Sequence, residues 1–165
     1  MTGVDQPIHY IIMPSGSGKS TLASQYPDKF VDIDTLVDHD NEQLVYWKRI
    51  ALNNGDWFKY NHIFCELVAI NFPRLTNKTL LVHHQDHIKL LQNEMVISFY
   101  PIATLIPTVQ LHEQNISTRT DEAKDIARQN RLSVFGDDDV YEFASYHELR
   151  YVMIMLEQIA DYEGI

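Results

Sequence analysis

Residues 14–21, Pro14-Ser15-Gly16-Ser17-Gly18-Lys19-Ser20-Thr21, decide the fold of this chain. They follow a short apolar run, 8–13, that is typical of a buried strand. They also open a segment, 19–26, that has the length of a short helix and is ended by Pro27. A glycine-rich turn that joins a strand to a helix and ends in Gly-Lys-Ser is the pattern of a phosphate-binding loop.

Each residue type in this loop has a chemical reason. Glycines let the backbone curl so that successive N–H groups face a phosphate, and the start of the helix adds further donors. The Lys19 ammonium can then reach the β- and γ-phosphates, while the Ser20 hydroxyl ligates Mg²⁺. The competing interpretation is a Gly/Ser turn that carries a lysine by chance. The nucleotide-binding residues predicted here are Ser15, Gly16, Ser17, Gly18, Lys19, Ser20 and Thr21.

One position departs from the usual Gly-x-x-x-x-Gly-Lys pattern. Its first glycine is replaced by Met13 in this chain. A residue other than glycine there can change the angle at which the strand enters the loop. Because the core of residues 16–20 is intact, we expect nucleotide binding to survive this change.

The rest of the chain alternates strand-like apolar runs with helical patterns. Continuous apolar runs suit strands that are covered on both faces, as in a parallel sheet. The pattern predicts an α/β fold, a three-layer sandwich with a mostly parallel sheet, in a single domain over residues 1–165. The expected strands are 8–13, 30–34, 79–83 and 95–99, and the expected helices are 19–26, 42–53, 61–75, 120–131 and 146–162.

Two carboxylates stand at the end of the second expected strand, Phe30-Val31-Asp32-Ile33-Asp34. The tip of the strand beside the phosphate-loop strand lies near the γ-phosphate in α/β folds. Transfer of a phosphoryl group to an alcohol needs a group there that accepts the hydroxyl proton. Asp32 is predicted to support Mg²⁺ through water. For both acids the alternative is an exposed carboxylate at a strand end.

The loop, the short helix after it and Asp32-Ile33-Asp34 resemble the small P-loop kinases, which phosphorylate nucleosides, nucleotides, other small molecules or polynucleotide ends. Residues 30–34 are most similar to the polynucleotide-kinase type and to related phage kinases that act on DNA hydroxyls. The resemblance covers residues 8–38, with a looser match over 119–131. It implies ATP and Mg²⁺ as cofactors, Lys19 as a catalytic residue, and Asp34 as the base that meets the acceptor hydroxyl.

The segment 119–131 carries four of the thirteen basic residues. On a helix, Lys124, Arg128 and Arg131 form one ridge. A mobile helix with such a ridge can close over transferring phosphates and neutralise the developing charge. We therefore expect Arg128 and Arg131 to be catalytic and residues 117–133 to form a lid. The alternative is a solvated basic face that is paired with acids of the same segment.

Weaker signals come from histidines and aromatic residues. His83-His84-x-x-His87 lacks a cysteine or a close carboxylate pair, so a histidine cluster facing the crevice is favoured over a zinc site. Asp86 is a candidate acid for orienting Mg²⁺, at an unusual offset from the strand. Aromatic side chains can stack an acceptor base, although core packing is the stronger expectation. They are Tyr46, Trp47, Trp57, Phe58 and Tyr60, of which Trp57 and Phe58 follow a turn and are the better candidates.

Composition and charge limit the remaining possibilities. Thirteen basic against 23 acidic residues give a net charge of −10, which argues against a broad, non-specific nucleic-acid coat but not against a local basic cleft. The single cysteine, Cys65, excludes an intrachain disulfide and lies in an apolar run that predicts a buried thiol. No apolar stretch approaches the ~18 residues that a membrane span needs, and the first residues lack a secretory signal. A cytoplasmic protein with no membrane partner is expected.

Together these features predict an ATP-dependent phosphotransferase that moves the γ-phosphate to a hydroxyl of a nucleic acid or nucleotide, as a polynucleotide or modified-base DNA kinase does. A small-molecule kinase for a nucleoside, a nucleoside monophosphate or a sugar acid is the first alternative. A nucleotide-dependent binding or switch protein that hydrolyses slowly is the second. The sequence leaves the acceptor and the oligomeric state open.

Overall fold

A five-stranded sheet in the order β2-β3-β1-β4-β5 forms the centre of the computed structural model, which describes residues 8–71, 78–95, 98–134 and 140–156. Every pair of neighbouring strands is parallel, as the apolar runs predicted. The carboxyl ends of β1, β2 and β3 therefore meet at one edge, where loops can build a site. The strands are β1 Ile8–Ile12, β2 Phe30–Asp32, β3 Thr79–Val82, β4 Phe99–Pro107 and β5 Val140–Phe143.

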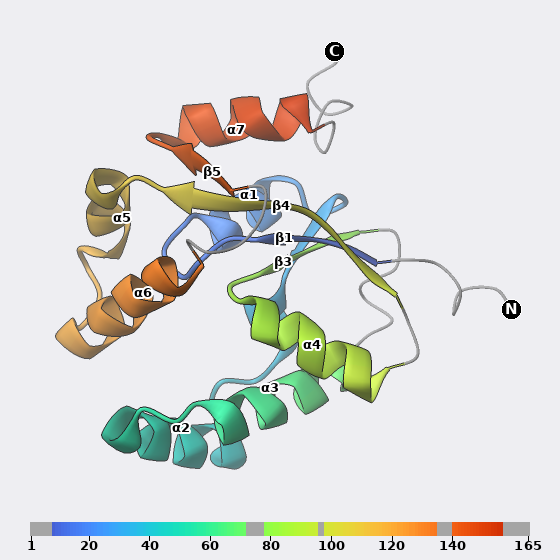
Figure 1. Cartoon of the computed structure of the whole chain (residues 1–165), viewed down its shortest axis with the longest axis vertical. Helices are drawn as coiled ribbons and strands as arrows, with labels where there is room; N and C mark the ends of the chain where they lie inside the picture. Colours follow the sequence, from blue (N-terminus) through green and yellow to red (C-terminus); the bar gives the residue numbers. More distant parts are fainter. Residues whose placement is uncertain (1–7, 72–77, 96–97, 135–139, 157–165) are drawn as a thin grey trace, which may run out of the picture.

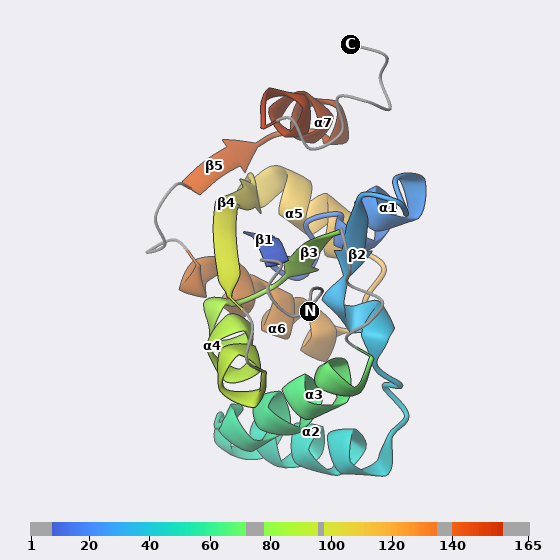
Figure 2. The same cartoon turned by 90° about the vertical axis from the view of Figure 1, so that its right-hand side faces the viewer.

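Helices cover both faces of this sheet and complete the three layers, so the predicted α/β sandwich is confirmed. In Figure 1, α7 lies on one side of the sheet, while α2, α3 and α4 lie on the other. Figure 2 shows that α2 is the outermost of these three and that α3 lies between α2 and α4. The helices are α1 Lys19–Gln25, α2 Glu42–Asn54, α3 Phe58–Ile70, α4 Gln85–Glu94, α5 Val109–Ile116, α6 Asp121–Ser133 and α7 Tyr146–Met155, with a 3₁₀ helix, η2 Ile33–Leu36.

Alternation along β1 divides the core into two clusters. Tyr10 and Ile12 pack with residues of α3 and α4, whereas Ile11 and Met13 pack with residues of α1 and α7. The period of two in a strand sends successive side chains to opposite faces, and both faces here are buried. Because the strand is fixed from both sides, the loop that follows it starts from a rigid position.

The second strand ends earlier than predicted, at Asp32 rather than residue 34. The Asp32 carboxylate accepts a hydrogen bond from the backbone N–H of Asp34 at 3.0 Å, which caps η2 and turns the chain out of the sheet. Aspartate competes in this way with ladder hydrogen bonds. Asp34 is consequently held on a short helix and not on a strand.

Several other boundaries also differ. Helix α3 covers Phe58–Ile70 rather than 61–75, and residues 72–75 lie outside the described residues. The strand predicted at 95–99 starts at Phe99 and runs to Pro107. The pairing of β4 with β1 shifts register between Tyr10 and Ile11 of β1, next to Pro101 of β4. Because proline cannot donate a hydrogen bond to the sheet, Pro101 makes this segment hard to recognise as a strand from its sequence. Helix α6 extends the predicted helix to Ser133, α7 is described to Met155, and 157–162 lie outside the described residues.

Besides η2, three elements were not predicted: α4, α5 and β5. Helix α4 begins in the histidine cluster, where His84 caps it by accepting the N–H of Asp86 at 3.0 Å. Histidine is an uncommon cap, so the usual start signal is missing. In the part of the chain that the structure describes, no helix has both the length and the apolar character to cross a membrane.

Candidate functional site

The loop of residues 13–18 follows β1 directly and turns into α1. Gly16 and Gly18 have φ angles of +87° and +98°, which favour glycine. A Cβ on Gly16 would lie 2.6 Å from Cγ2 of Ile116, so even an alanine does not fit there. The positions of both glycines thus follow from backbone shape, and the loop has the curled form that the motif predicted.

Met13 is a core residue in this protein. Its side chain is fully buried, and its N–H donates to the Val82 carbonyl at 2.7 Å, so the pairing of β1 with β3 continues one residue beyond Ile12. A glycine at this position leaves the space beside Leu22 unfilled. The departure from the usual motif is therefore explained by packing in the core beneath the loop.

Helices α5 and α6 hold the outer side of the loop. The Ser15 N–H donates to Oδ1 of Asn130 at 2.6 Å, and Nδ2 of Asn130 donates to the His83 carbonyl at 2.7 Å. One amide thereby ties the loop to the end of β3. Three further contacts involve residues 15 and 16: His112 Nε2 donates to the Ser15 carbonyl at 2.8 Å, Asn115 Nδ2 to the Gly16 carbonyl at 2.9 Å, and Arg119 Nη1 to Ser15 Oγ at 2.9 Å.

Lys19 lies buried beneath the loop, with 5% of its surface exposed. Its ammonium donates to the Pro14 carbonyl at 3.5 Å. Burial lowers the pKa of Lys19, while the negative charges of Asp34 and Asp32 raise it in part. The Ser17 hydroxyl is also buried and has no hydrogen-bond partner among the described residues. An incoming anion can therefore meet a desolvated cation and an unused donor.

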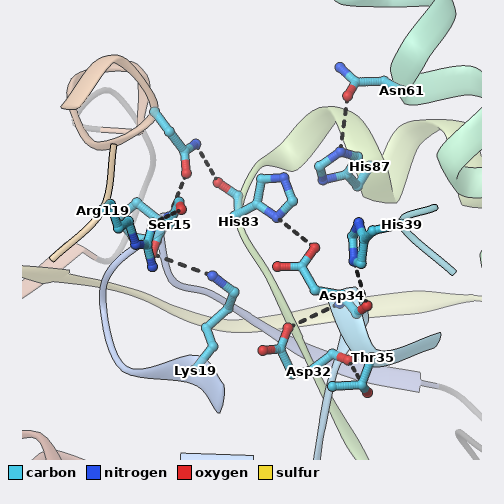
Figure 3. Close-up of polar contacts among 12 residues, drawn as sticks. Ser15, Lys19, Asp32, Asp34, Thr35, His39, Asn61, His83, His87 and Arg119 are labelled. Carbon is cyan, nitrogen blue, oxygen red and sulfur yellow. Dashed lines mark hydrogen bonds and ion pairs between the residues drawn. The ribbon is translucent and has the colours of Figure 1, made fainter. Parts of the chain in front are cut away.

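The two predicted carboxylates lie at the end of β2 and on η2 directly after it, and they differ in environment. The expectation that their strand lies beside the phosphate-loop strand is wrong, because β3 lies between β1 and β2. Asp32 is buried, and this burial raises its pKa against the attraction of Lys19. Asp34 is half-exposed, and its Oδ1 lies 3.9 Å from Nδ1 of His83. In Figure 3 the Asp34 carboxylate stands between Lys19 and His83. Both acids lie close enough to the loop lysine for their charges to raise its pKa.

A cavity of about 510 Å³ opens at this edge of the sheet. One wall comes from the loop and α6, including Ser15, Arg119 and Asn130; the opposite wall comes from Trp57, Tyr60 and Asn61 of the α3 region. Asp34 and the histidines 83, 84 and 87 also line the cavity, in line with the prediction that the histidine cluster faces the crevice. Burial and the charge of Asp34 raise the pKa of Tyr60 to about 12, so its phenol stays protonated.

Two of the five aromatic residues singled out from the sequence line the cavity. Trp57 lines the cavity together with Tyr60, which was ranked lower, and the two rings meet edge to face at 5.3 Å. Phe58 does not line the cavity; it is 67% exposed and stacks on His62. Cys65 is fully buried, and burial raises the pKa of its thiol to about 12, which confirms a structural thiol. Asp86, the candidate Mg²⁺-orienting acid, lies at the cavity edge in the first turn of α4.

The structure does not bring Arg128 and Arg131 to the loop. The Arg128 guanidinium makes a two-pronged contact with Glu113 at 2.7 and 2.8 Å. Arg131 is buried and donates to the Pro107 carbonyl at 2.9 Å and to Glu142 at 3.2 Å. The expectation of one exposed ridge is therefore wrong, because α6 turns Arg131 toward the ends of β4 and β5.

Arg119 is the arginine that contacts the loop, and the sequence interpretation passed over it. It precedes Thr120, whose hydroxyl caps α6 by accepting the N–H of Ala123 at 3.2 Å. Arg119 lies before the first residue of the helix, so helical spacing does not include it and favours Arg128 and Arg131 instead. The sequence placed Arg119 in the basic segment 119–131, but its local pattern does not distinguish it from the other basic residues there.

Comparison with known proteins gives no family model that matches the chain. The chain is 30% identical over 148 residues to a protein named RNA-directed RNA polymerase from Penicillium chrysogenum virus (isolate Caston/2003). The match covers 84% of this chain but 12% of that protein. The chain thus spans about an eighth of the length of this curated relative.

Two solved structures share the fold. A gluconokinase from Sinorhizobium meliloti 1021 superposes with a TM-score of 0.51 at 13% identity, over 96% of this chain and 95% of that one. A sugar kinase from Janibacter sp. HTCC2649 superposes with a TM-score of 0.52 at 15% identity, over 93% of this chain and 96% of that one. At these identities the similarity shows a common architecture, and it confirms the α/β fold predicted from the sequence.

Proposed function

We propose that this chain is an ATP-dependent phosphotransferase that transfers the γ-phosphate to an acceptor hydroxyl. One observation carries the proposal: Asp34 lines the cavity and lies close enough to the loop lysine, Lys19, for its charge to raise the pKa of that lysine. A phosphate donor at the loop and a hydroxyl in the cavity would then meet between these two groups. Hydrolysis requires no acceptor cavity of this kind, so the arrangement favours a kinase over a switch.

The residues of the loop fit a nucleotide triphosphate. Its curled backbone, the buried ammonium of Lys19 and the unused hydroxyl of Ser17 all favour an anion. We assign nucleotide binding to residues 15–21, as the motif predicted. Ser20 and the buried carboxylate of Asp32 would hold Mg²⁺, which when bound offsets phosphate charge.

In the proposed reaction, the acceptor oxygen forms a bond to the γ-phosphorus while the bond from that phosphorus to the β,γ-bridging oxygen breaks. The hydroxyl proton passes to Asp34, which is half-exposed and borders the cavity. Lys19 and Arg119 stabilise the charge on the transferring group. Arg119 takes the role predicted for Arg128 and Arg131, because those two guanidinium groups contact Glu113, Pro107 and Glu142 instead.

A small hydroxylated molecule is the acceptor that the site favours. The cavity of about 510 Å³ falls within the range of small-molecule sites, roughly 300–1,000 Å³. The two structural neighbours are named a gluconokinase and a sugar kinase, which supports the same class of acceptor. Among the alternatives drawn from the sequence, a small-molecule kinase is therefore preferred here over a DNA kinase.

A nucleic-acid or nucleotide acceptor is the second candidate. Trp57 and Tyr60 offer aromatic faces at the cavity wall, on which a base can stack. The viral relative is named as an RNA polymerase, which makes an RNA end the first polynucleotide to test.

A panel of acceptors with γ-labelled ATP tests the proposal. It contains gluconate and neutral sugars, nucleosides, nucleoside monophosphates, 5′-hydroxyl RNA and DNA oligonucleotides, and hydroxymethylated DNA. The matched variants are Lys19→Ala, expected to weaken ATP binding, and Asp34→Asn, expected to slow single-turnover transfer by ~10²–10⁴-fold while ATP still binds. Label that appears only as free phosphate, with every acceptor, would favour the switch protein and refute the kinase.

A further inference from the structure

The side of Asp34 that faces away from Lys19 is occupied by histidine rings. Nδ1 of His83 lies 3.9 Å from Oδ1 of Asp34, and the rings of His83 and His87 meet edge to face with centroids 4.3 Å apart. His87 in turn contacts Oδ1 of Asn61 through Nε2, at 3.2 Å. Figure 3 shows these side chains in sequence, from the carboxylate to helix α3. The proposed base therefore has a defined polar neighbour on one side.

The position of His83 is fixed by its surroundings. It follows Val82 at the end of β3, the strand between β1 and β2. Its carbonyl accepts a hydrogen bond from Asn130, the residue that also holds the loop. Its ring packs edge-on against Phe64 at 6.2 Å. Because the His83 ring is held in place by these contacts, it can fix the orientation of the Asp34 side chain.

The hydrogen-bond partners define where the protons of the neighbouring rings lie. Nε2 of His87 faces a carbonyl oxygen of Asn61, so it carries the proton of that ring. Nδ1 of His84 accepts the N–H of Asp86, so its proton in the neutral ring lies on Nε2. The Nδ1 atoms of His83 and His87 are both enclosed and have no hydrogen-bond partner among the described residues, but only that of His83 is seen to face a carboxylate.

Burial lowers the pKa of His83 well below its usual value, so the ring is neutral near pH 7. The same burial makes the ring of His83 a poor proton acceptor. A neutral ring can still donate from one nitrogen. A shift of about 1 Å brings the two atoms, now 3.9 Å apart, to the usual length of a hydrogen bond.

We propose that His83 is a positioning residue for Asp34: it carries its proton on Nδ1, donates it to Oδ1 of Asp34, and leaves the other carboxylate oxygen for the acceptor hydroxyl. This inference rests on the proposed function, in which Asp34 is the base. The proposed role of His83 differs from both metal binding and core packing.

Two substitutions separate positioning from packing. His83→Leu removes the donor and fills the space, and kcat should fall by about 10–100-fold, as expected for a lost hydrogen bond to a charged group. His83→Asn keeps an N–H near the place of Nδ1, so it should restore most of the rate. The KM for ATP should stay unchanged in both. His147→Leu, an exposed change on α7 outside the cavity, is the matched control and should leave kcat as it is.

A measurement without turnover completes the test. In ¹⁵N-labelled free protein, long-range ¹H–¹⁵N spectra distinguish the two neutral forms of each ring. We expect the proton of His83 on Nδ1 and those of His84 and His87 on Nε2, with a change in the His83 signal in Asp34→Ala. A proton on Nε2 of His83 overturns the proposal, as does a wild-type kcat in His83→Leu. If no acceptor is phosphorylated, the proposed function fails. The spectrum still decides separately whether His83 carries its proton on Nδ1 and donates it to Asp34.

Discussion

Replacement of Gly16 by alanine should damage the loop far more than the same change at Gly55. Both residues have positive φ angles, +87° and +75°, so alanine pays a similar backbone cost of roughly 1–2 kcal/mol at each. The loss of chain freedom in the unfolded state offsets about 0.4–1 kcal/mol of this. Nothing lies within 4 Å of a Cβ on Gly55, so Gly55→Ala should lose about 1 kcal/mol of unfolding free energy.

Gly16→Ala adds a collision to this cost. Its Cβ would stand 2.6 Å from Cγ2 of Ile116 and 3.0 Å from Nε2 of His112. Neither neighbour can move freely, because Ile116 is fully buried and His112 donates to the Ser15 carbonyl. Overpacking of this kind typically costs 1–3 kcal/mol. The total loss should be about 3 kcal/mol, some 2 kcal/mol more than at Gly55.

Urea unfolding of the wild type and both variants measures these differences, and calorimetric titration with ATP gives a second readout. Gly16→Ala should bind ATP much more weakly, since the loop must move away from α5, while Gly55→Ala should bind normally. Equal losses of stability in the two variants, with equal ATP affinity, would show that α5 does not press on the loop as described.

Three further predictions concern charged groups. Arg119→Gln should lower kcat at saturating ATP. Arg128→Gln breaks only contacts with exposed carboxylates, so it should leave both kcat and the melting temperature nearly unchanged. Equal kcat values in the two variants would show that Arg119 has no role in the site. Arg131→Gln should destabilise the protein by about 1–3 kcal/mol, because it removes the donor to the buried Pro107 carbonyl, and urea unfolding at pH 7.5 checks this. The pKa of buried His87 lies well below 6.5 in the folded protein, so the unfolded chain binds its proton first as the pH falls. Stability should therefore decline below about pH 6.5, by up to ~1.4 kcal/mol per pH unit from this group, and His87→Phe should flatten that slope.

Local chemistry explains which parts could be predicted from the sequence. The loop and β1 to β3 are encoded by residues that are neighbours in the chain, and glycine, proline and apolar runs mark their limits. Strand β4 was misplaced because Pro101 and the register slip beside it break the strand pattern. Asp34 was assigned to a strand because the capping by Asp32 is a matter of side-chain direction, which a sequence does not display.

Contacts between distant residues explain what could not be predicted. Asn130 joins Ser15 and His83, which are 115 and 47 positions away from it, and nothing in its local sequence marks it as part of a site. Arg131 has the spacing of a ridge with Arg128, yet α6 directs it to Pro107. Helical periodicity gives relative directions around a helix, and only the packed sheet determines which of them faces the loop.

Asn130 and Arg131 are consecutive residues, and together they make α6 a junction between separate parts of the sheet. The first contacts the ends of β1 and β3, and the second contacts Pro107 of β4 and Glu142 of β5. A displacement of α6 as a whole would disturb all of these contacts at once. The same connection means that a ligand on the loop should slow amide exchange in β5, on the far edge of the sheet.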